Sequence, residues 1–358
     1  LSATRETANT LEELRKQYKE LLKKYHPDNP NGSTEATQEV NAEYDNLFKV
    51  LKDRHERKTE QASDTNDNKT DYNNMKYDLR TCDSAYDFIL DFMNMISKEY
   101  LDELLIGCKN DFDIFWERNY DRIAEVDISE LQIMAFHIIG ALDDCKEIQK
   151  KGLMNLQEVL SNDTILNRQL NDVGIKFNIQ EKTVNCNGKV YDIDYEQYCG
   201  RSSLSETEEK LRDIAYRVYY DFCVNGFLLN DNVYDYGTDI HERPEFLMTF
   251  GNLFPEAKKL DGVWRSKSKS YKIDFYATID QIHRFSFELD EFKDEGQLEL
   301  DDEMKIKKWM LSYAVDRAAK KLDTQFLYVK DDVIISPEQI IEISELYSYK
   351  NNPINRQG

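Results

Sequence analysis

Three places in the sequence gather side chains that can bind partners or take part in chemistry. Near the N-terminus, Tyr25-His26-Pro27-Asp28 follows a run of basic residues. In the middle, His137 is the titratable residue of a mostly apolar stretch, residues 131–140. Further on, residues 234–246 are dense in titratable groups, and loops of this kind often carry sites. That loop contains Tyr236, His241 and Arg243. The helices, strands and loops that contain these residues determine whether their side chains can bind a partner or take part in a reaction.

Tyr25-His26-Pro27-Asp28 lies at the end of a predicted helix. Thr10 and Glu13 have the spacing of a capping box, which marks the start of that helix. Apolar residues then recur at helical spacing up to Tyr25, and Lys19 and Lys23 contribute to a positive face beside them. Pro27 ends the helix, because the residue before a proline disfavours the α conformation. A second helix over residues 33–57 would pack antiparallel to the first across a short loop.

This arrangement resembles the J-domain of DnaJ-type co-chaperones, above all those carried on mobile elements of Gram-positive bacteria. The resemblance is carried by the helix, by Tyr25-His26-Pro27-Asp28 and by Glu39-Val40-Asn41 in the second helix. It implies a J-domain-like helical hairpin over residues 1–58. It also implies that His26, Pro27 and Asp28 contact a DnaK-type chaperone and stimulate its ATPase, with no cofactor. Lys19 and Lys23 would steer the encounter with an acidic surface on that partner. A plain helical hairpin is the alternative.

Residues 59–80 are interpreted as a flexible polar linker. The stretch from Lys58 to Lys69 has no large apolar residue and therefore cannot bury enough surface to offset the entropy of ordering. Beyond it, residues 81–358 alternate apolar helical and strand patterns, so the fold class is α+β, with a helical subdomain possible over residues 81–128. Expected helices cover residues 84–103, 143–151, 205–224 and 303–322, with a last helix from Ser336; expected strands cover 131–140, 183–193, 271–278, 284–289, 325–329 and 333–335.

The strand around His137, followed by a short helix and Gly152-Leu153, resembles the opening of DarT-like ADP-ribosyltransferase toxins. The resemblance implies NAD as cofactor and His137 as the residue that holds its ribose. Tyr236 or His241 would then line the NAD pocket, and Arg243 would meet the pyrophosphate. Gln325 occupies the position of that family's catalytic glutamate, and Glu288 is a possible substitute. The alternatives are a histidine satisfied within the core and a surface loop with local ion pairs.

Charge limits the partners of the C-terminal part. The chain has a net charge of −22, and residues 1–80 carry 14 Lys and Arg against 16 Asp and Glu, so about −20 lies in residues 81–358. A surface of this sign repels phosphate backbones, which argues against nonspecific nucleic-acid binding. The same charge also suits an acidic mimic of nucleic acid that blocks a nucleic-acid enzyme. The client or substrate is not specified.

The cysteines and the apolar runs give expectations about compartment. The six cysteines include no C-x-x-C pair and have no histidine at metal-ligand spacing, so neither a disulfide framework nor a metal site is expected. No apolar run approaches 18 residues, and no signal-peptide pattern is found. These features favour a cytoplasmic protein without a membrane span.

Overall fold

The computed structural model describes residue 33 and residues 75–95, 101–102, 112–201, 203–288 and 301–346. The chain divides into two compact units, residues 1–71 and 72–358. The predicted N-terminal helices and residues 59–74 of the predicted linker lie outside the described residues. The second unit combines helices with antiparallel sheets, which confirms the α+β class.

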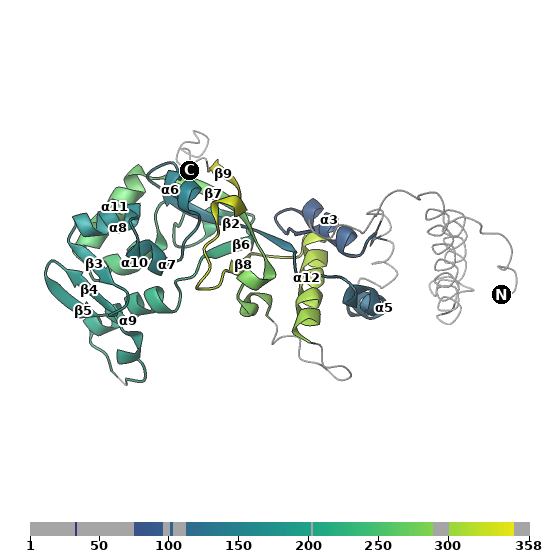
Figure 1. The fold of residues 1–358 in the computed structure, drawn as a ribbon, viewed down its shortest axis with the longest axis horizontal. Helices are drawn as coiled ribbons and strands as arrows, with labels where there is room; N and C mark the ends of the chain where they lie inside the picture. Colours follow the sequence, from purple (N-terminus) through teal and green to yellow (C-terminus); the bar gives the residue numbers. More distant parts are fainter. Residues whose placement is uncertain are drawn as a thin grey trace, which may run out of the picture. The chain divides into compact units, whose positions relative to one another are not determined.

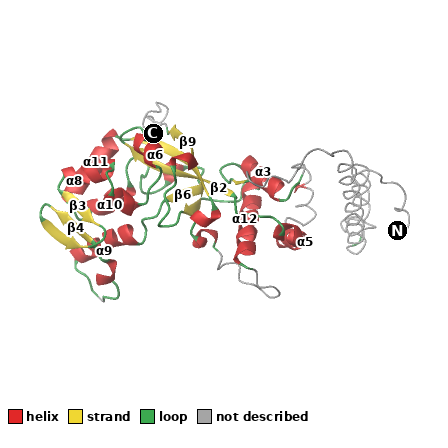
Figure 2. Cartoon of the chain, in the orientation of Figure 1, coloured by secondary structure: helices red, strands yellow, loops and turns green. Residues whose placement is uncertain are grey.

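The main sheet is built around one long central strand. Its order is β8-β6-β2-β7-β9, with a short β1 that pairs with β2 (Figures 1 and 2). β1 runs parallel to β2, and the other neighbours are antiparallel. The strands are β1 (Lys76–Tyr77), β2 (Gln132–Ala141), β6 (Asn225–Leu229), β7 (Lys269–Ala277), β8 (Gln325–Tyr328) and β9 (Ile340–Glu345). β2 is therefore the central strand of the sheet, with β6 on one side and β7 on the other.

Two groups of helices lie on either side of this sheet in Figure 1. The first group packs on the N-terminal part of β2 and comprises α3 (Cys82–Phe92), α5 (Phe112–Ala124) and α12 (Asp302–Ala318). The second comprises α6 (Lys146–Lys151), α7 (Leu156–Ser161), α8 (Ile165–Asp172), α9 (Glu206–Tyr219), α10 (Glu245–Gly251) and α11 (Pro255–Lys267). A small sheet in the second group contains β3 (Ile175–Asn178), β4 (Thr183–Cys186) and β5 (Lys189–Asp192). Each group has its own buried cluster.

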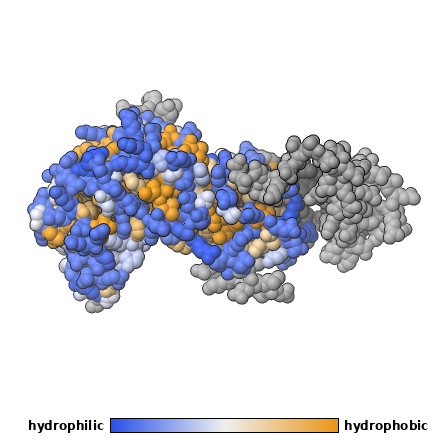
Figure 3. Space-filling view, viewed as in Figure 1, coloured by the Kyte–Doolittle hydropathy of each residue, from blue (hydrophilic) through white to orange (hydrophobic). Residues whose placement is uncertain are grey.

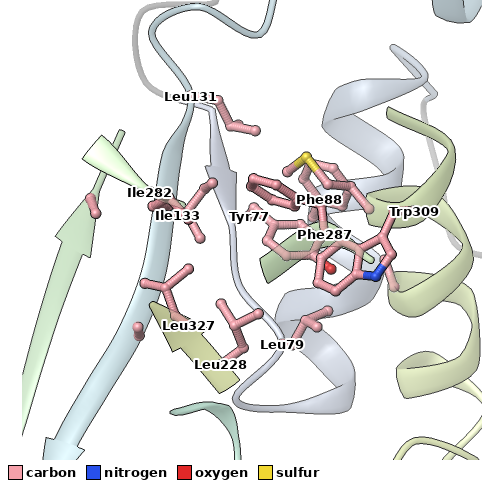
Figure 4. Packing of buried hydrophobic residues seen from close by; sticks show 14 of the residues in the cluster. Tyr77, Leu79, Phe88, Leu131, Ile133, Leu228, Ile282, Phe287, Trp309 and Leu327 are labelled. Carbon is pink, nitrogen blue, oxygen red and sulfur yellow. The ribbon is translucent and has the colours of Figure 1, made fainter. Parts of the chain in front are cut away.

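The first cluster is rich in aromatic rings. Trp309 of α12 packs edge-on to Phe287 at 5.4 Å between ring centroids, and Tyr77 of β1 packs edge-on to Phe88 of α3 at 4.9 Å (Figure 4). Aromatic pairs in such geometry contribute beyond the area they bury. The cluster also includes Ile133 of β2, so the described parts of α3 and α5 share one core with the sheet.

Residues 75–80 belong to this core, although the sequence analysis assigned them to the linker. Tyr77 is fully buried, and β1 pairs with the start of β2. Arg80 forms ion pairs with Asp78 at 2.7 Å and with Asp274 of β7 at 2.5 Å. The apolar residues of this short segment are few, but each of them finds a partner in the folded domain.

Several local predictions are confirmed because short-range chemistry determines them. Ser205 and Glu208 form the expected capping box of α9. Asn187 and Gly188, with φ of 51° and 90°, make the two-residue turn between β4 and β5. Gly152, with φ of 80°, ends α6 as expected. The N-cap of α6 is Cys145 and not Asp143 or Asp144, although the Asp143 carboxylate accepts from the Glu147 amide at 2.7 Å.

Other predictions are wrong. Residues 284–287 form a 3-10 helix instead of a strand, because Phe287 turns into the core while Phe285 is exposed. The predicted last helix is a single 3-10 turn, Pro337–Gln339, followed by β9, which pairs with β7. The predicted strand at 333–335 is reduced to a bridge between Ile335 and Leu153. Finally, α9 ends at Tyr219, and Asn225-Gly226 begins β6.

Candidate functional site

A cavity of about 570 Å³ lies beside the second half of β2. β2 and β6 pair at Phe136 and Phe227, whereas β2 continues to Ala141 along β7 alone. Residues of α6 to α8, of the segment between α9 and β6, and of the loop before α10 surround the space next to this part of β2. In Figure 3 the visible surface is mostly hydrophilic, with apolar residues gathered near the middle of the domain. The cavity has the size of many small-ligand sites.

His137 lines the cavity and links the two separating strands. Its Nδ1 lies 2.7 Å from the backbone oxygen of Asn225, the first residue of β6. A carbonyl oxygen can only accept, so Nδ1 carries the hydrogen and Nε2 bears the lone pair in the neutral ring. Burial lowers the pKa of His137, and the hydrogen bond to Asn225 acts in the opposite direction. The imidazole is therefore neutral near pH 7 and can accept a hydrogen bond through Nε2.

The loop before α10 reaches the cavity by crossing β2 at Gly140. The Gly140 amide donates to the Ile240 oxygen at 3.2 Å. A Cβ on Gly140 would lie 2.4 Å from the backbone carbon of Glu242, so only glycine allows the loop to approach this closely. The close approach places Tyr236 and Arg243 in the cavity lining.

Tyr236 contributes an aromatic wall. Its ring packs edge-on to Phe227 of β6 at 5.5 Å, and Phe326 of β8 lies 6.2 Å away. Burial, followed by the charge of Glu245, raises the pKa of Tyr236, so the hydroxyl stays protonated at neutral pH. It can donate a hydrogen bond but does not supply a phenolate.

The guanidinium of Arg243 is already paired within the protein. Its side chain is 2% exposed, forms an ion pair with Asp261 of α11, and donates to the Thr238 oxygen at 2.6 Å. Arg265 of α11 forms a second ion pair with the same loop, to Glu242 at 2.8 Å. Because a buried guanidinium needs these partners, Arg243 fixes the loop to α11. The pyrophosphate role expected from the sequence stays a prediction.

The other three residues expected at the site do not line this cavity among the described residues. The His241 ring packs edge-on to Tyr234 at 5.2 Å. Glu288 accepts from the Tyr313 hydroxyl and lies 3.4 Å from Trp309 Nε1, at the aromatic cluster. Gln325 pairs with Leu229 at the start of β8, while Phe326 and Tyr328 of the same strand face the cavity. The structure thus brings together His137, Tyr236 and Arg243.

Charged residues that sequence reasoning missed also line the cavity. Arg217 at the end of α9 pairs with Asp221 and, at 2.9 Å, with Glu245 of α10. Asp143 and Glu147 lie in the lining as well. Acidic residues thus outnumber the basic pair Arg217 and Arg243. The i, i+4 spacing of Arg217 and Asp221 was a signal in the sequence, but the helix was interpreted by its apolar stripe alone.

Cys223 is a thiol at the cavity wall. Burial, followed by the charges of Asp331 and Asp221, raises its pKa to about 12, so it is not a thiolate at neutral pH. Its Sγ lies 3.1 Å from the Asn225 side-chain oxygen. The other described cysteines, Cys82, Cys145, Cys186 and Cys199, are also free thiols.

The N-terminal site residues lie outside the described residues. They are Lys19, Lys23, Tyr25, His26, Pro27 and Asp28. For the part of the chain that is described, no helix combines the length and apolar character needed to cross a membrane.

Comparison with known proteins informs the N-terminal segment. Residues 4–59 match the family model of the DnaJ domain. This match confirms the resemblance drawn from the basic helix and Tyr25-His26-Pro27-Asp28, and a DnaJ domain implies a partner of the DnaK type. Neither the curated proteins nor the solved structures contain a match to this chain.

Proposed function

We propose that this protein is a J-domain co-chaperone that recruits a DnaK-type chaperone and stimulates its ATPase. The observation that carries the proposal is the DnaJ match over residues 4–59, which contains His26-Pro27-Asp28. In this proposal the tripeptide makes the contact that promotes hydrolysis. Lys19 and Lys23, close before it in the chain, raise the association rate with an acidic surface.

The C-terminal domain supplies what the chaperone is recruited to. Its cavity has apolar walls from β2, β6 and β8, and the acidic residues in its lining outnumber the basic ones even after Arg217 has paired with Asp221 and Glu245. This combination suits a ligand or client segment with an apolar body and a positive charge. The two modules then act together, because the J-domain brings the ATPase close to whatever occupies the cavity.

The test is single-turnover ATP hydrolysis by a DnaK-type chaperone with the full-length protein. The wild-type protein accelerates hydrolysis, and His26→Gln and Asp28→Asn remove most of the acceleration. Loss of an interface hot spot costs at least about 2 kcal/mol, so the concentration needed for stimulation rises by roughly 30-fold.

His55→Gln is the matched control, because His55 also lies within the DnaJ match but outside the tripeptide. It should stimulate like the wild type. Equal stimulation by His26→Gln, or none by the wild-type protein, would contradict the proposal.

A second candidate function is transfer of ADP-ribose from NAD. The observation in its favour is that His137, Tyr236 and Arg243 line one cavity. Two features oppose it: the guanidinium of Arg243 is already paired with Asp261, and the acidic lining repels a pyrophosphate. Calorimetric titration of the full-length protein with NAD decides the point. Heat that disappears in both His137→Ala and Tyr236→Phe supports the transferase, and no binding by the wild-type protein eliminates it.

A further inference from the structure

Three residues far apart in the sequence converge beside the cavity. Cys223 lies in the segment between α9 and β6, His283 follows β7, and Asp331 lies in the turn after β8. One potential ligand atom from each, the thiol sulfur, a ring nitrogen and a carboxylate oxygen, lies within 4.8 Å of the other two. We propose that Cys223, His283 and Asp331 bind a divalent metal ion, and that the ion is Zn²⁺.

The backbone around these residues is tied together, so the ligands are held in place before a metal arrives. Three hydrogen bonds join the three segments: Val329 to the Val224 oxygen at 3.0 Å, His283 to the Tyr328 oxygen at 2.9 Å, and Lys330 to the Gln281 oxygen at 2.8 Å. The buried Asn155 side chain also donates to the backbone oxygen of Asp331 at 2.6 Å. Every ligand is therefore within two residues of a fixed backbone contact, which is the arrangement that makes a metal site precise.

The donor set selects the metal. The Cys223 thiol would release its proton to solvent when the metal binds. The resulting thiolate, together with imidazole and carboxylate, matches the ligands that Zn²⁺ takes in proteins, whereas Mg²⁺ and Ca²⁺ prefer oxygen ligands alone. Around a tetrahedral Zn²⁺, neighbouring ligand atoms are roughly 3.5 Å apart, given the usual bond lengths. His283 Nε2 and Asp331 Oδ1 are already 3.0 Å apart. The other ligand atoms lie within 4.8 Å of one another, so side-chain rotation must bring them closer when the metal binds.

The site is accessible and incomplete. The side chains of His283 and Asp331 are 26% and 53% exposed, so an ion can enter from solvent. Cys223 lines the cavity, so the ion would lie at its edge. Three protein ligands leave a fourth tetrahedral position for water or for a group of the molecule in the cavity. A surface ion pair between His283 and Asp331 explains two of the three residues but not the thiol beside them.

The test is Co²⁺ substitution in the full-length protein after treatment with a chelator. Co²⁺ bound to a thiolate gives a sulfur-to-metal charge-transfer band, and Zn²⁺ at one equivalent abolishes it by displacement. Cys223→Ser removes the band. His283→Ala and Asp331→Asn weaken Zn²⁺ binding by at least about 100-fold, because even outer-shell changes cost 10- to 100-fold.

The matched controls are Cys199→Ser, at an exposed free cysteine, and Asp332→Asn, next to the proposed ligand. Both should bind as the wild type does. A second measurement needs no variant: Zn²⁺ should slow alkylation of Cys223, but not of Cys199, in the wild-type protein. The proposal is overturned if the wild type shows no charge-transfer band, if the band survives Cys223→Ser, or if Zn²⁺ leaves the alkylation of Cys223 unchanged.

Discussion

The two halves of β2 have similar sequences and different surroundings. At Ile133 the strand has β1 on one edge and β7 on the other, and its side chain is buried in the aromatic cluster. From His137 onward β7 remains beside it, β6 turns away, and the cavity opens. The apolar pattern of β2 predicts burial along its whole length. In the structure, the first half packs in the aromatic cluster, whereas the second half borders the cavity.

The comparison shows what keeps an opening in a well-packed domain. In the first half, the rings of Tyr77, Phe88 and Trp309 are buried and pack against one another. In the second half, a hydrogen bond from His137 to Asn225 and the close approach of a loop to Gly140 fix the positions of two cavity walls relative to β2. Polar and close backbone contacts position the neighbours of β2 in the second half, whereas packing of aromatic rings positions them in the first half.

The largest expected effect is on the filled side. Trp309→Ala should lower the free energy of unfolding by about 3–5 kcal/mol, because removal of a buried aromatic ring leaves a cavity. Phe326→Ala, on the cavity side, should cost less, about 1–2 kcal/mol, because the Phe326 side chain is only partly buried. Urea unfolding followed by circular dichroism measures both. Similar losses for the two variants would mean that the sides are equally packed.

A smaller effect is expected where the loop crosses β2. Gly140→Ala should destabilise the protein by about 1–3 kcal/mol, because the added methyl collides with the backbone of Glu242. Gly262→Ala in α11 is the matched control, since no atom lies within 4 Å of its added Cβ. That variant should gain about 0.5–1 kcal/mol from helix propensity. If Gly140→Ala were as stable as the wild type, the loop would not be held by this contact.

The smallest effect concerns His137. His137→Leu leaves the Asn225 oxygen without its donor and should cost about 1 kcal/mol, whereas His137→Asn can donate from nearly the same position and should cost less. Stability is measured by urea unfolding at pH 7. Equal losses in the two variants would show that the hydrogen bond contributes nothing.

The pH dependence of the same residue tests its protonation state. The pKa of His137 is lowered in the folded state, whereas the unfolded histidine titrates near about 6.5. Below that pH the unfolded chain binds a proton that the folded chain does not, so stability falls as the pH falls through about 6.5. His137→Asn should therefore lose less stability than the wild type between pH 7 and pH 5. An identical slope would place the pKa of His137 at its ordinary value.

The sequence by itself determined the features that depend on neighbours along the chain. The capping box at Ser205, the Asn187-Gly188 turn and the strand through His137 follow from local hydrogen bonding, backbone conformation and periodicity. The DnaJ resemblance also rests on a contiguous motif, and the family match confirms it.

Only the tertiary structure decided which strands meet and which side chains share a cavity. The segment after Pro337 pairs with β7 and is a strand, because that edge of the sheet needs a partner for its backbone groups. Tyr236 and His137 line the same cavity. Gln325 does not line it, because the register of β8 turns Phe326 and Tyr328 toward the cavity. Cys223, His283 and Asp331 come together through backbone bonds between three loops, and spacing along the chain carries no trace of those bonds.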